Sequence, residues 1–212
     1  MAELGVDWGG ITHVALTHFH ADHTSDLANL IYAWRYGMLP PRTAPVEIVG
    51  PVGTSDLVAR LADAFGASLL TALPLTIREI APDEHLALGE GCEMIARTVP
   101  HTAESVAYSV SSPRRRVVVS GDTGFDPVFG EWAQGSDVLV LECSLPDALA
   151  ITTHLTPRQC GQVAAAARPN LLVLTHFYPP VESVDIEAQV AEYFDGRVVR
   201  ASDGWMIDLE ET

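Results

Sequence analysis

The sequence predicts a layered α/β fold in which helices cover a mixed β-sheet. Two observations support this prediction: strand-like and helix-like runs alternate along most of the 212 residues, and one antiparallel patch at 74–112 interrupts the alternation. Such alternation is typical of sheets that carry helices on their faces. A chain of this length can bury a sizeable core. Because no repeat, low-complexity tract or linker divides it, we expect one domain over residues 1–212.

Each expected element depends on a local pattern. Strands are predicted where β-branched and aliphatic residues form short runs, and helices where apolar residues recur every three or four positions. Caps mark the helix ends: Thr54 or Ser55 begins one helix, Gly66 ends it, and Thr156 with Pro157 begins another. In chain order we expect a strand at 11–17, a helix at 22–37, a strand at 46–50, a helix at 53–66, the antiparallel region at 74–112, strands at 115–120 and 137–143, a helix at 156–169, a strand at 170–176 and a helix at 183–194.

The charge balance narrows the range of partners. The formal net charge is −16, and such a surface repels polyanions. The basic cluster Arg114–Arg116 follows Ser-Ser-Pro and precedes a strand, which indicates a hairpin turn. We therefore expect a small anionic or ester substrate rather than a long nucleic acid.

The sequence also favours a cytoplasmic protein with no membrane partner. No apolar run approaches the roughly 20 residues that a membrane span needs, and no signal peptide is visible. Cys92, Cys143 and Cys160 are odd in number and form no CxxC pair. Widely spaced cysteines of this kind suit reduced thiols.

Potential metal ligands follow four of the predicted strands, where the loops of layered α/β folds converge. In an extended segment residues i and i+2 point the same way, so His18 and His20 can bind one ion. Asp22 and His23 lie where the chain enters a helix and can reach a second ion, and Asp122 lies in a glycine-flanked turn. Seven ligands are too many for one zinc ion, which takes four, but suit two metals with one shared ligand. The set comprises His18, His20, Asp22, His23, His101, Asp122 and His176.

This series of motifs resembles that of the metallo-β-lactamase superfamily, and in particular its ribonuclease Z-like phosphodiesterase branch. The motifs that carry the resemblance are HxHxDH at 18–23, His101, SGDT at 120–123, LTHF at 174–177, GPVGT at 50–54 and HLT at 154–156. The resemblance implies an αββα four-layer sandwich. Because residue 11 already begins the strand of the first motif, we expect the first N-terminal strands of that fold to be missing. An upstream extension of the gene or a homodimer would then cover the open sheet edge.

The resemblance also implies a role for each site residue. The ligands are expected to divide into His18, His20 and His101 on one metal, Asp22, His23 and His176 on the other, and Asp122 between them. His154 matches an additional histidine of the branch, which contacts the scissile phosphate and assists the leaving group. The expected catalytic residues are Asp22, Asp122 and His154. The expected cofactors are two divalent ions, zinc or alternatively manganese or iron.

These residues predict a hydrolase in which a metal-bridging hydroxide attacks a small phosphodiester. The tRNA-processing members of the branch carry a long basic arm, but only 20 residues lie between His101 and Asp122, so tRNA is not the expected substrate. One alternative is hydrolysis of a lactone, thioester, β-lactam or sulfate ester by the same dinuclear site. Another is a non-catalytic metal-binding protein, which the full set of ligands argues against. His154 discriminates between phosphodiester and acyl chemistry, because simple acyl hydrolysis needs no phosphate-contacting histidine.

Several other polar residues have less specific interpretations. Glu142, at a strand end, either orients a ligand or caps a neighbouring turn. His13 and His85 are expected to lie outside the metal site, in a strand and in a solvated turn. Cys143 is expected to be a small buried residue rather than a nucleophile, because no base accompanies it in the sequence.

Overall fold

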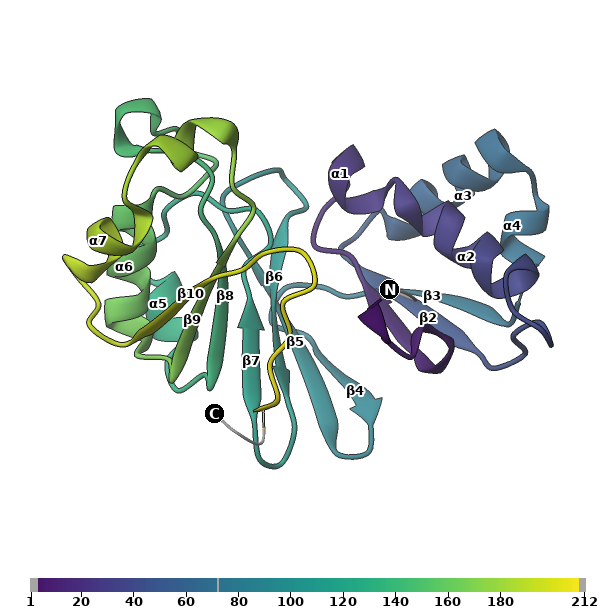
Figure 1. Cartoon of the computed structure of the whole chain (residues 1–212). Helices are drawn as coiled ribbons and strands as arrows, with labels where there is room; N and C mark the ends of the chain where they lie inside the picture. The colour runs from purple at the N-terminus through teal and green to yellow at the C-terminus, as the bar shows by residue number, and fades with distance from the viewer. Residues whose placement is uncertain (1–3, 72, 210–212) are drawn as a thin grey trace. The chain divides into compact units, whose positions relative to one another are not determined.

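The computed structural model describes residues 4–71 and 73–209 and divides the chain into two compact units, Met1–Ala81 and Pro82–Thr212 (Figure 1). Within the described residues, each unit contains one β-sheet. No helix in these ranges is both long enough and apolar enough to cross a membrane. The mixture of strands and helices confirms the predicted α/β class, while the prediction of one domain stays a prediction.

The first unit is a parallel sheet with helices along one side (Figure 1). Its elements are η2 (Trp8–Gly10), β1 (His13–Ala15), α1 (Ala21–Thr24), α2 (Asp26–Tyr36), β2 (Val46–Gly50), α3 (Thr54–Phe65), α4 (Ser68–Thr71) and β3 (Leu75–Glu79). The strand order is β1-β2-β3, with Val14 opposite Ile48 and Ile48 opposite Ile77. Ile31 and Trp34 of α2 are fully buried together with Ile48, so α2 packs through the apolar face that its sequence predicts.

Three predictions for this unit need correction. The strand β3 was expected within the antiparallel region, but it pairs parallel with β2, because α3 and α4 carry the chain back to the same sheet direction. The cap of α3 is neither Thr54 nor Ser55 but Gly53, whose φ is 105°. The backbone N–H of Ser55 instead donates to Glu79 Oε1 over 2.9 Å. The helix expected at 22–37 is divided at Ser25 into α1 and α2.

A buried arginine holds the first residues of the unit in place. Arg42 is only 6% exposed. Its guanidinium donates to the carbonyl oxygens of Gly9, Ile11 and Pro45, and lies 5.0 Å from the ring centroid of Trp34. None of these contacts involves a carboxylate. The carbonyl acceptors and the aromatic face of Trp34 thereby compensate the buried positive charge of Arg42.

The second unit is a mixed sheet whose strand order is β10-β9-β8-β7-β6-β5-β4. Its elements are β4 (His85–Gly89), β5 (Cys92–Thr98), β6 (Val106–Ser111), β7 (Arg116–Val119), α5 (Phe129–Trp132), β8 (Val138–Glu142), η3 (Asp147–Leu149), α6 (Pro157–Ala167), β9 (Leu171–Thr175), η4 (Pro179–Ser183), α7 (Ile186–Ala191) and β10 (Arg197–Arg200). The helices α5, α6 and α7 lie on one face of this sheet (Figure 1). Leu139, Leu172 and Phe129 are among the buried side chains between them.

Most predictions for this unit are confirmed. Strands β4 to β7 pair antiparallel, and the Arg114–Arg116 cluster stands at the hairpin between β6 and β7. Thr156 caps α6 in a reciprocal capping box with Gln159. The predicted bounds of the helix at 183–194 are wrong. Helix α7 begins only after Asp185, whose side chain accepts a hydrogen bond from Ala188 N.

The strand directions place four loops at one edge of this sheet. Strands β7, β8 and β9 are parallel to one another. Strand β5 runs the same way as β7, because each is antiparallel to the strand β6 between them. The segments that follow β5, β7, β8 and β9 therefore leave the sheet at the same edge, which is where the predicted ligands of this unit occur.

We predict that Arg42→Met lowers the free energy of unfolding by about 2–4 kcal/mol, because several backbone carbonyls lose their donor. Arg35→Met is the matched control. Arg35 is exposed on α2 and lies 5.9 Å from the Tyr36 ring centroid, so its loss should change stability by at most ~0.5 kcal/mol. Urea unfolding followed by tryptophan fluorescence measures both variants. Equal effects of the two substitutions would contradict the structural role of Arg42.

Candidate metal centre

The predicted ligands form two sets, one in each unit. In the first unit, β1 ends before a short loop that leads into α1. His18 is fully buried, and its ring centroid lies 4.7 Å from that of His20 and 4.2 Å from that of His23. Asp22 is exposed, and its Oδ2 lies 3.4 Å from His23 Nε2. The HxHxDH motif thus brings three imidazole rings together at the start of α1 and places a carboxylate beside His23.

The second set lies at the loop edge of the second sheet. His101 follows β5, Asp122 follows β7 and His176 follows β9. Asp122 is 3% exposed, and its Oδ2 lies 3.8 Å from His101 Nε2 and 3.4 Å from His176 Nε2. His154 joins this group, because Asp122, His154 and His176 each offer a ligand atom within 4.8 Å of the others. One carboxylate oxygen therefore faces two imidazole nitrogens that come from different strand ends.

Hydrogen bonds from the Nδ1 atoms orient the histidines of the second set. His101 Nδ1 lies 2.9 Å from the carbonyl oxygen of Thr153, and His154 Nδ1 lies 2.8 Å from Glu142 Oε1. Carbonyl and carboxylate oxygens only accept hydrogen bonds, so Nδ1 of each ring carries a proton, and in the neutral ring the lone pair is on Nε2. This is the arrangement that metal-binding histidines show, with the second ring nitrogen donating to an oxygen.

Ser144 orients His176 in the same way. Its Oγ lies 2.9 Å from His176 Nδ1, and its hydroxyl donates to Glu142 Oε2, which leaves Oγ as the acceptor for the ring N–H. His176 has a φ of 59°, in the left-handed region that residues other than glycine rarely occupy. Strained conformations of this kind concentrate at functional sites.

The donor set fits a divalent metal ion. Imidazole nitrogens and a carboxylate are ordinary zinc ligands, and two ligands of one tetrahedral zinc ion lie about 3.3 Å apart at the usual bond lengths of about 2.0–2.1 Å. The separation of 3.4 Å between Asp122 Oδ2 and His176 Nε2 is close to that value. The structure therefore supports a His/Asp site able to hold metal, while the union of the two sets in one dinuclear centre stays a prediction.

The sequence left two interpretations for Glu142, orienting a ligand or capping a turn, and its contacts favour the first. It is 1% exposed and accepts hydrogen bonds from Thr123 N, from the Ser144 hydroxyl and from the ring of His154. Sequence reasoning missed Ser144, although its position directly after the strand-end pair Glu142-Cys143 was a usable signal. It also missed Tyr178, whose ring centroid lies 5.4 Å from that of His154 and 5.2 Å from that of His176.

Of the remaining polar candidates, His13 lies in a strand and Cys143 is buried as expected, whereas His85 was expected in a solvated turn but is the first residue of β4. His13 lies opposite Glu47 on the neighbouring strand, with 3.7 Å between Nε2 and Oε2, and His85 pairs with Glu93 in an exposed position. Cys143 is fully buried in the core.

Comparisons with known proteins identify the fold. The model of the beta-lactamase superfamily domain matches residues 4–177. The uncharacterized protein ML1173 of Mycobacterium leprae (strain TN) is 30% identical over 206 residues, which cover 95% of this chain and 72% of that protein. A ribonuclease Z of Mycobacterium sp. (strain KMS) is 26% identical over 231 residues, which cover 96% of this chain and 79% of that enzyme.

A solved structure agrees with these matches. The metallo-beta-lactamase fold protein YhfI from Bacillus subtilis has a TM-score of 0.81 with this chain at 21% identity, and the match covers 94% of this chain and 79% of YhfI. The metallo-β-lactamase fold and the ribonuclease Z-like resemblance that the motifs predict are thereby confirmed.

We predict that Ser144→Ala weakens zinc binding by about 10–100-fold, the usual cost of losing an outer partner of a ligand histidine, because His176 loses the acceptor for its Nδ1–H. Competition with a chromophoric chelator measures the affinity. Ser136→Ala is the control. Ser136 is also buried in the second unit, and its hydroxyl donates no hydrogen bond to any of these histidines. Unchanged affinity in Ser144→Ala would show that His176 needs no such orientation.

Proposed function

This chain belongs to the beta-lactamase superfamily of metallo-β-lactamase-fold hydrolases, and from that premise we propose that it hydrolyses small phosphodiesters with two divalent metal ions. The single observation that carries the choice of phosphodiesters is the pair formed by His154 and the buried Glu142, 2.8 Å apart, beside Asp122 and His176. Acyl hydrolysis by metals alone does not need such a pair.

The proposed metal assignment follows the family resemblance. His18, His20 and His101 would hold one ion, Asp22, His23 and His176 would hold the other, and Asp122 would be a ligand to both. The contacts of Asp122 Oδ2, 3.8 Å from His101 Nε2 and 3.4 Å from His176 Nε2, support this assignment, in which those two histidines are assigned to different ions. Zinc is the proposed metal, on the basis of the imidazole-rich donor set. When bound, two such ions supply an activated water nucleophile and neutralise charge on substrate oxygens.

His154 is the proposed proton donor to the leaving oxygen. Its Nδ1–H donates to Glu142, which fixes the ring plane and leaves Nε2 for the substrate. The carboxylate of Glu142 compensates the positive charge of the imidazole when the ring carries a second proton, as the carboxylate of a catalytic triad does. The capped N-terminus of α6 follows two residues later, and its partial positive charge favours an anionic phosphate group.

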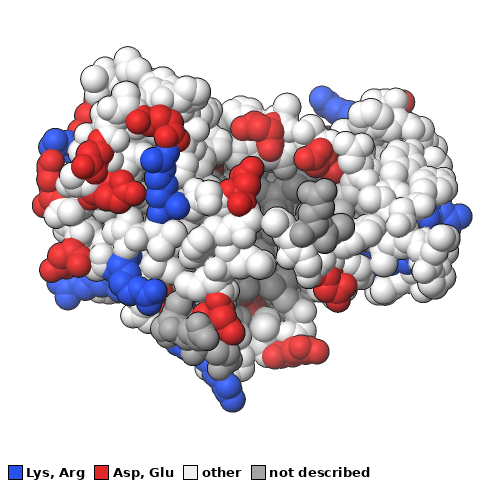
Figure 2. Space-filling view, in the orientation of Figure 1, with Lys and Arg blue, Asp and Glu red and all other residues white. Residues whose placement is uncertain are grey.

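The charge of the protein favours a small substrate over tRNA. The net charge is −16, and arginine side chains are interspersed with acidic ones on the face shown in Figure 2. Bound cations dominate the field at the site itself, so a small anion can bind there. A long polyanion would also meet the acidic surface outside the site. We propose a cytoplasmic location on the basis of the three free cysteines, two of them buried.

A substrate panel tests the proposal. The protein is assayed with bis(4-nitrophenyl) phosphate, nitrocefin, a lactone and a sulfate ester, and its metal content is determined alongside. Phosphodiester hydrolysis that a chelator abolishes supports the proposal. Hydrolysis of the lactone, nitrocefin or the sulfate ester without phosphodiesterase activity would replace the proposed phosphodiesterase by an acyl or sulfate ester hydrolase. Inactivity on all four substrates at full metal occupancy would favour a non-catalytic metal-binding protein.

We expect protein purified without chelator to contain close to two transition-metal ions per chain. His20→Ala should lower that occupancy and abolish hydrolysis, because a ligand of one ion is lost. His13→Ala is the control, since His13 pairs with Glu47 outside the ligand set, and it should keep both metal and activity. Full activity of a metal-free preparation would overturn the proposal.

We predict that His154→Ala keeps both metals but loses about 10²–10⁴-fold in phosphodiesterase kcat, the usual cost of removing a general acid. The loss should be smaller for a diester with a nitrophenolate leaving group, which needs little protonation. Measuring kcat for an alkyl-leaving and a nitrophenyl-leaving diester, together with metal content, checks both statements. Loss of a metal would identify His154 as a ligand, and full activity on both diesters would favour the acyl alternative.

A further inference from the structure

Three aromatic rings meet at the loop edge of the second sheet. The imidazoles of His154 and His176 are stacked, with their centroids 5.8 Å apart and an interplanar angle of 13°. The ring of Tyr178 lies 5.4 Å from that of His154 and 5.2 Å from that of His176, tilted by 56° and 45°. We infer that Tyr178 is a positioning residue that holds the His154 ring in the orientation for proton transfer, an inference that rests on the proposed function of His154.

The backbone fixes where the Tyr178 ring can lie. Tyr178 N donates to the carbonyl oxygen of Ser144 over 3.2 Å, and the carbonyl oxygen of Tyr178 accepts from Val181 N over 3.0 Å. Tyr178 precedes η4 in an extended conformation, with φ −81° and ψ 150°, and the Pro179 that follows favours this conformation. Val181 is fully buried and anchors η4 in the core. The chain itself therefore determines the position of Tyr178.

Packing of the core does not account for the Tyr178 ring. The neighbouring Phe177 packs against the core of the second unit. Successive side chains of an extended segment point to opposite sides, and the ring of Tyr178 contacts the two imidazoles instead. Tyr178 is 37% exposed, so part of its surface faces solvent while another part covers the histidines. Loss of this ring would therefore remove contacts from the site and leave the core intact.

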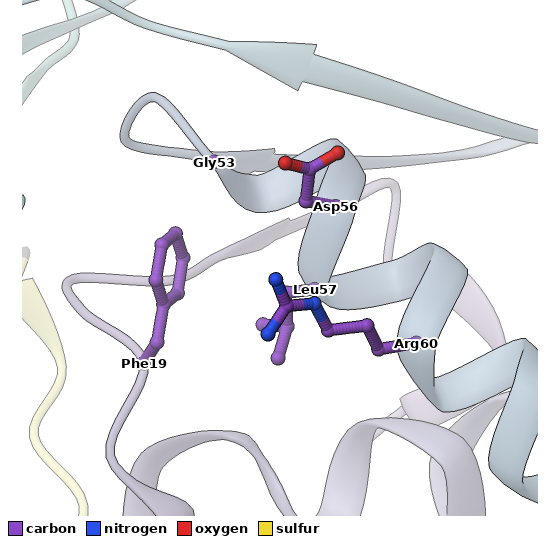
Figure 3. A pocket seen from close by; sticks show the side chains of 5 residues that line it. All are labelled: Phe19, Gly53, Asp56, Leu57 and Arg60. Carbon is purple, nitrogen blue, oxygen red and sulfur yellow. The ribbon is translucent and has the colours of Figure 1, made fainter.

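A place next to a metal ligand in the sequence does not by itself bring an aromatic ring onto the histidines. Phe19 lies between His18 and His20, but its ring points toward Gly53 (Figure 3), where a Cβ would lie 3.1 Å from Phe19 Cε2. That ring lines a hollow of about 360 Å³ together with Gly53, Asp56, Leu57 and Arg60. The contacts of Tyr178 are therefore a specific feature of the segment after β9.

Of the two histidines, His154 depends more on this contact. Ser144 Oγ lies 2.9 Å from His176 Nδ1, and a metal ion would hold Nε2 of the same ring, so both nitrogens of His176 would be fixed. His154 is bonded to Glu142 at Nδ1, but its Nε2 is assigned to the substrate rather than to a metal. The χ2 torsion of histidine has a broad energy minimum. Contacts on the ring itself must therefore limit the motion that remains.

Tyr178 can supply this restraint independently of the metal ions. The rings of His101 and His176 also contact His154, but both are proposed metal ligands, so their positions depend on the ions. The position of Tyr178 is set by the chain. Orientation matters for proton transfer, because a displacement of about 1 Å in a catalytic group can cost about 10²-fold in rate.

The kinetic test asks whether Tyr178 acts through His154. In Tyr178→Ala, kcat for an alkyl-leaving diester should fall about 10–100-fold, as for a displaced catalytic group. For a nitrophenyl-leaving diester it should fall less than about threefold, because this leaving group needs little protonation. Tyr178→Phe keeps the ring and should stay within about twofold of the wild type. In a His154→Ala background, Tyr178→Ala should cost less than about twofold more, since both changes then remove one function. Tyr193→Ala, at an exposed tyrosine after α7, is the control.

A spectroscopic measurement keeps this inference separate from the proposed function. The Nδ1–H of His154 donates to the carboxylate of Glu142, which is 1% exposed, so nitrogen-edited proton NMR should show it as a slowly exchanging signal that His154→Ala lacks. In Tyr178→Ala this proton should exchange at least about 10-fold faster, because motion of the ring opens the hydrogen bond. Tyr178→Phe and Tyr193→Ala should leave its exchange unchanged.

The outcomes separate the two claims. If the wild-type protein hydrolyses no diester, the proposed function fails, and the exchange rates alone decide the role of Tyr178. Unchanged exchange in Tyr178→Ala, or an equal loss of kcat for both diesters, would overturn the inference. Tyr178→Phe with the defects of Tyr178→Ala would assign the role to the hydroxyl and overturn it too, as would loss of metal from Tyr178→Ala, which would assign the ring to His176. If Tyr178→Ala does not fold, Tyr178→Leu takes its place.

Discussion

The buried carboxylate of Glu142 is the constraint on which the second unit's site depends. A carboxylate that is 1% exposed is costly unless hydrogen bonds compensate its charge. The donors are Thr123 N, the Ser144 hydroxyl and the ring of His154, which come from the segments after β7, after β8 and before α6. Compensating one charge therefore ties the connection after β7 to both ends of the connection between β8 and α6. Cys160 adds a contact from Sγ to the backbone oxygen of Glu142, and burial raises the pKa of its thiol, so that it stays protonated and can donate.

The sheet supplies the rigid support for those loops. Leu139 and Leu172 are fully buried and lie opposite each other on the adjacent parallel strands β8 and β9, so their packing fixes the register of the two strands. Close packing then joins the loops themselves. A Cβ at Gly124 would lie 1.8 Å from the carbonyl oxygen of Thr152, so only glycine allows this approach. The next carbonyl, that of Thr153, accepts the ring N–H of His101. The approach of two backbones thus determines the orientation of a ligand from a third segment.

These contacts explain which parts of the site the sequence could predict. The ligands were predictable because histidine and aspartate at strand ends are visible as residue types, and His101 and His176 follow the strands that the sequence indicates. The acceptor of His101 was not predictable, because it is a backbone carbonyl and any residue type could supply it. The two interpretations of Glu142 could not be separated by sequence, because only burial and the identity of its donors distinguish an orienting carboxylate from a cap.

The incorrect predictions for β3 and for the cap of α3 have a similar origin. Alternating burial along β3 resembles an antiparallel strand, and only its pairing with β2 shows that it continues a parallel sheet. At α3, local propensity favours Thr54 or Ser55 as the cap, but Glu79 provides the acceptor for Ser55 N from 24 positions away. Long-range partners therefore override local signals both in the sheet and at the helix end.

The tautomers explain how this edge of the sheet can hold a cation. The ring protons of His101 and His176 are directed to oxygens on the outer side, so the Nε2 lone pairs of both rings face the same oxygen of Asp122. Lone pairs and a carboxylate repel one another unless positive charge lies between them. A divalent cation can be shared by several acceptors at once, so it relieves this repulsion for both rings. Because the outer hydrogen bonds that fix the tautomers also hold the loops, metal binding and the order of these loops should be thermodynamically coupled.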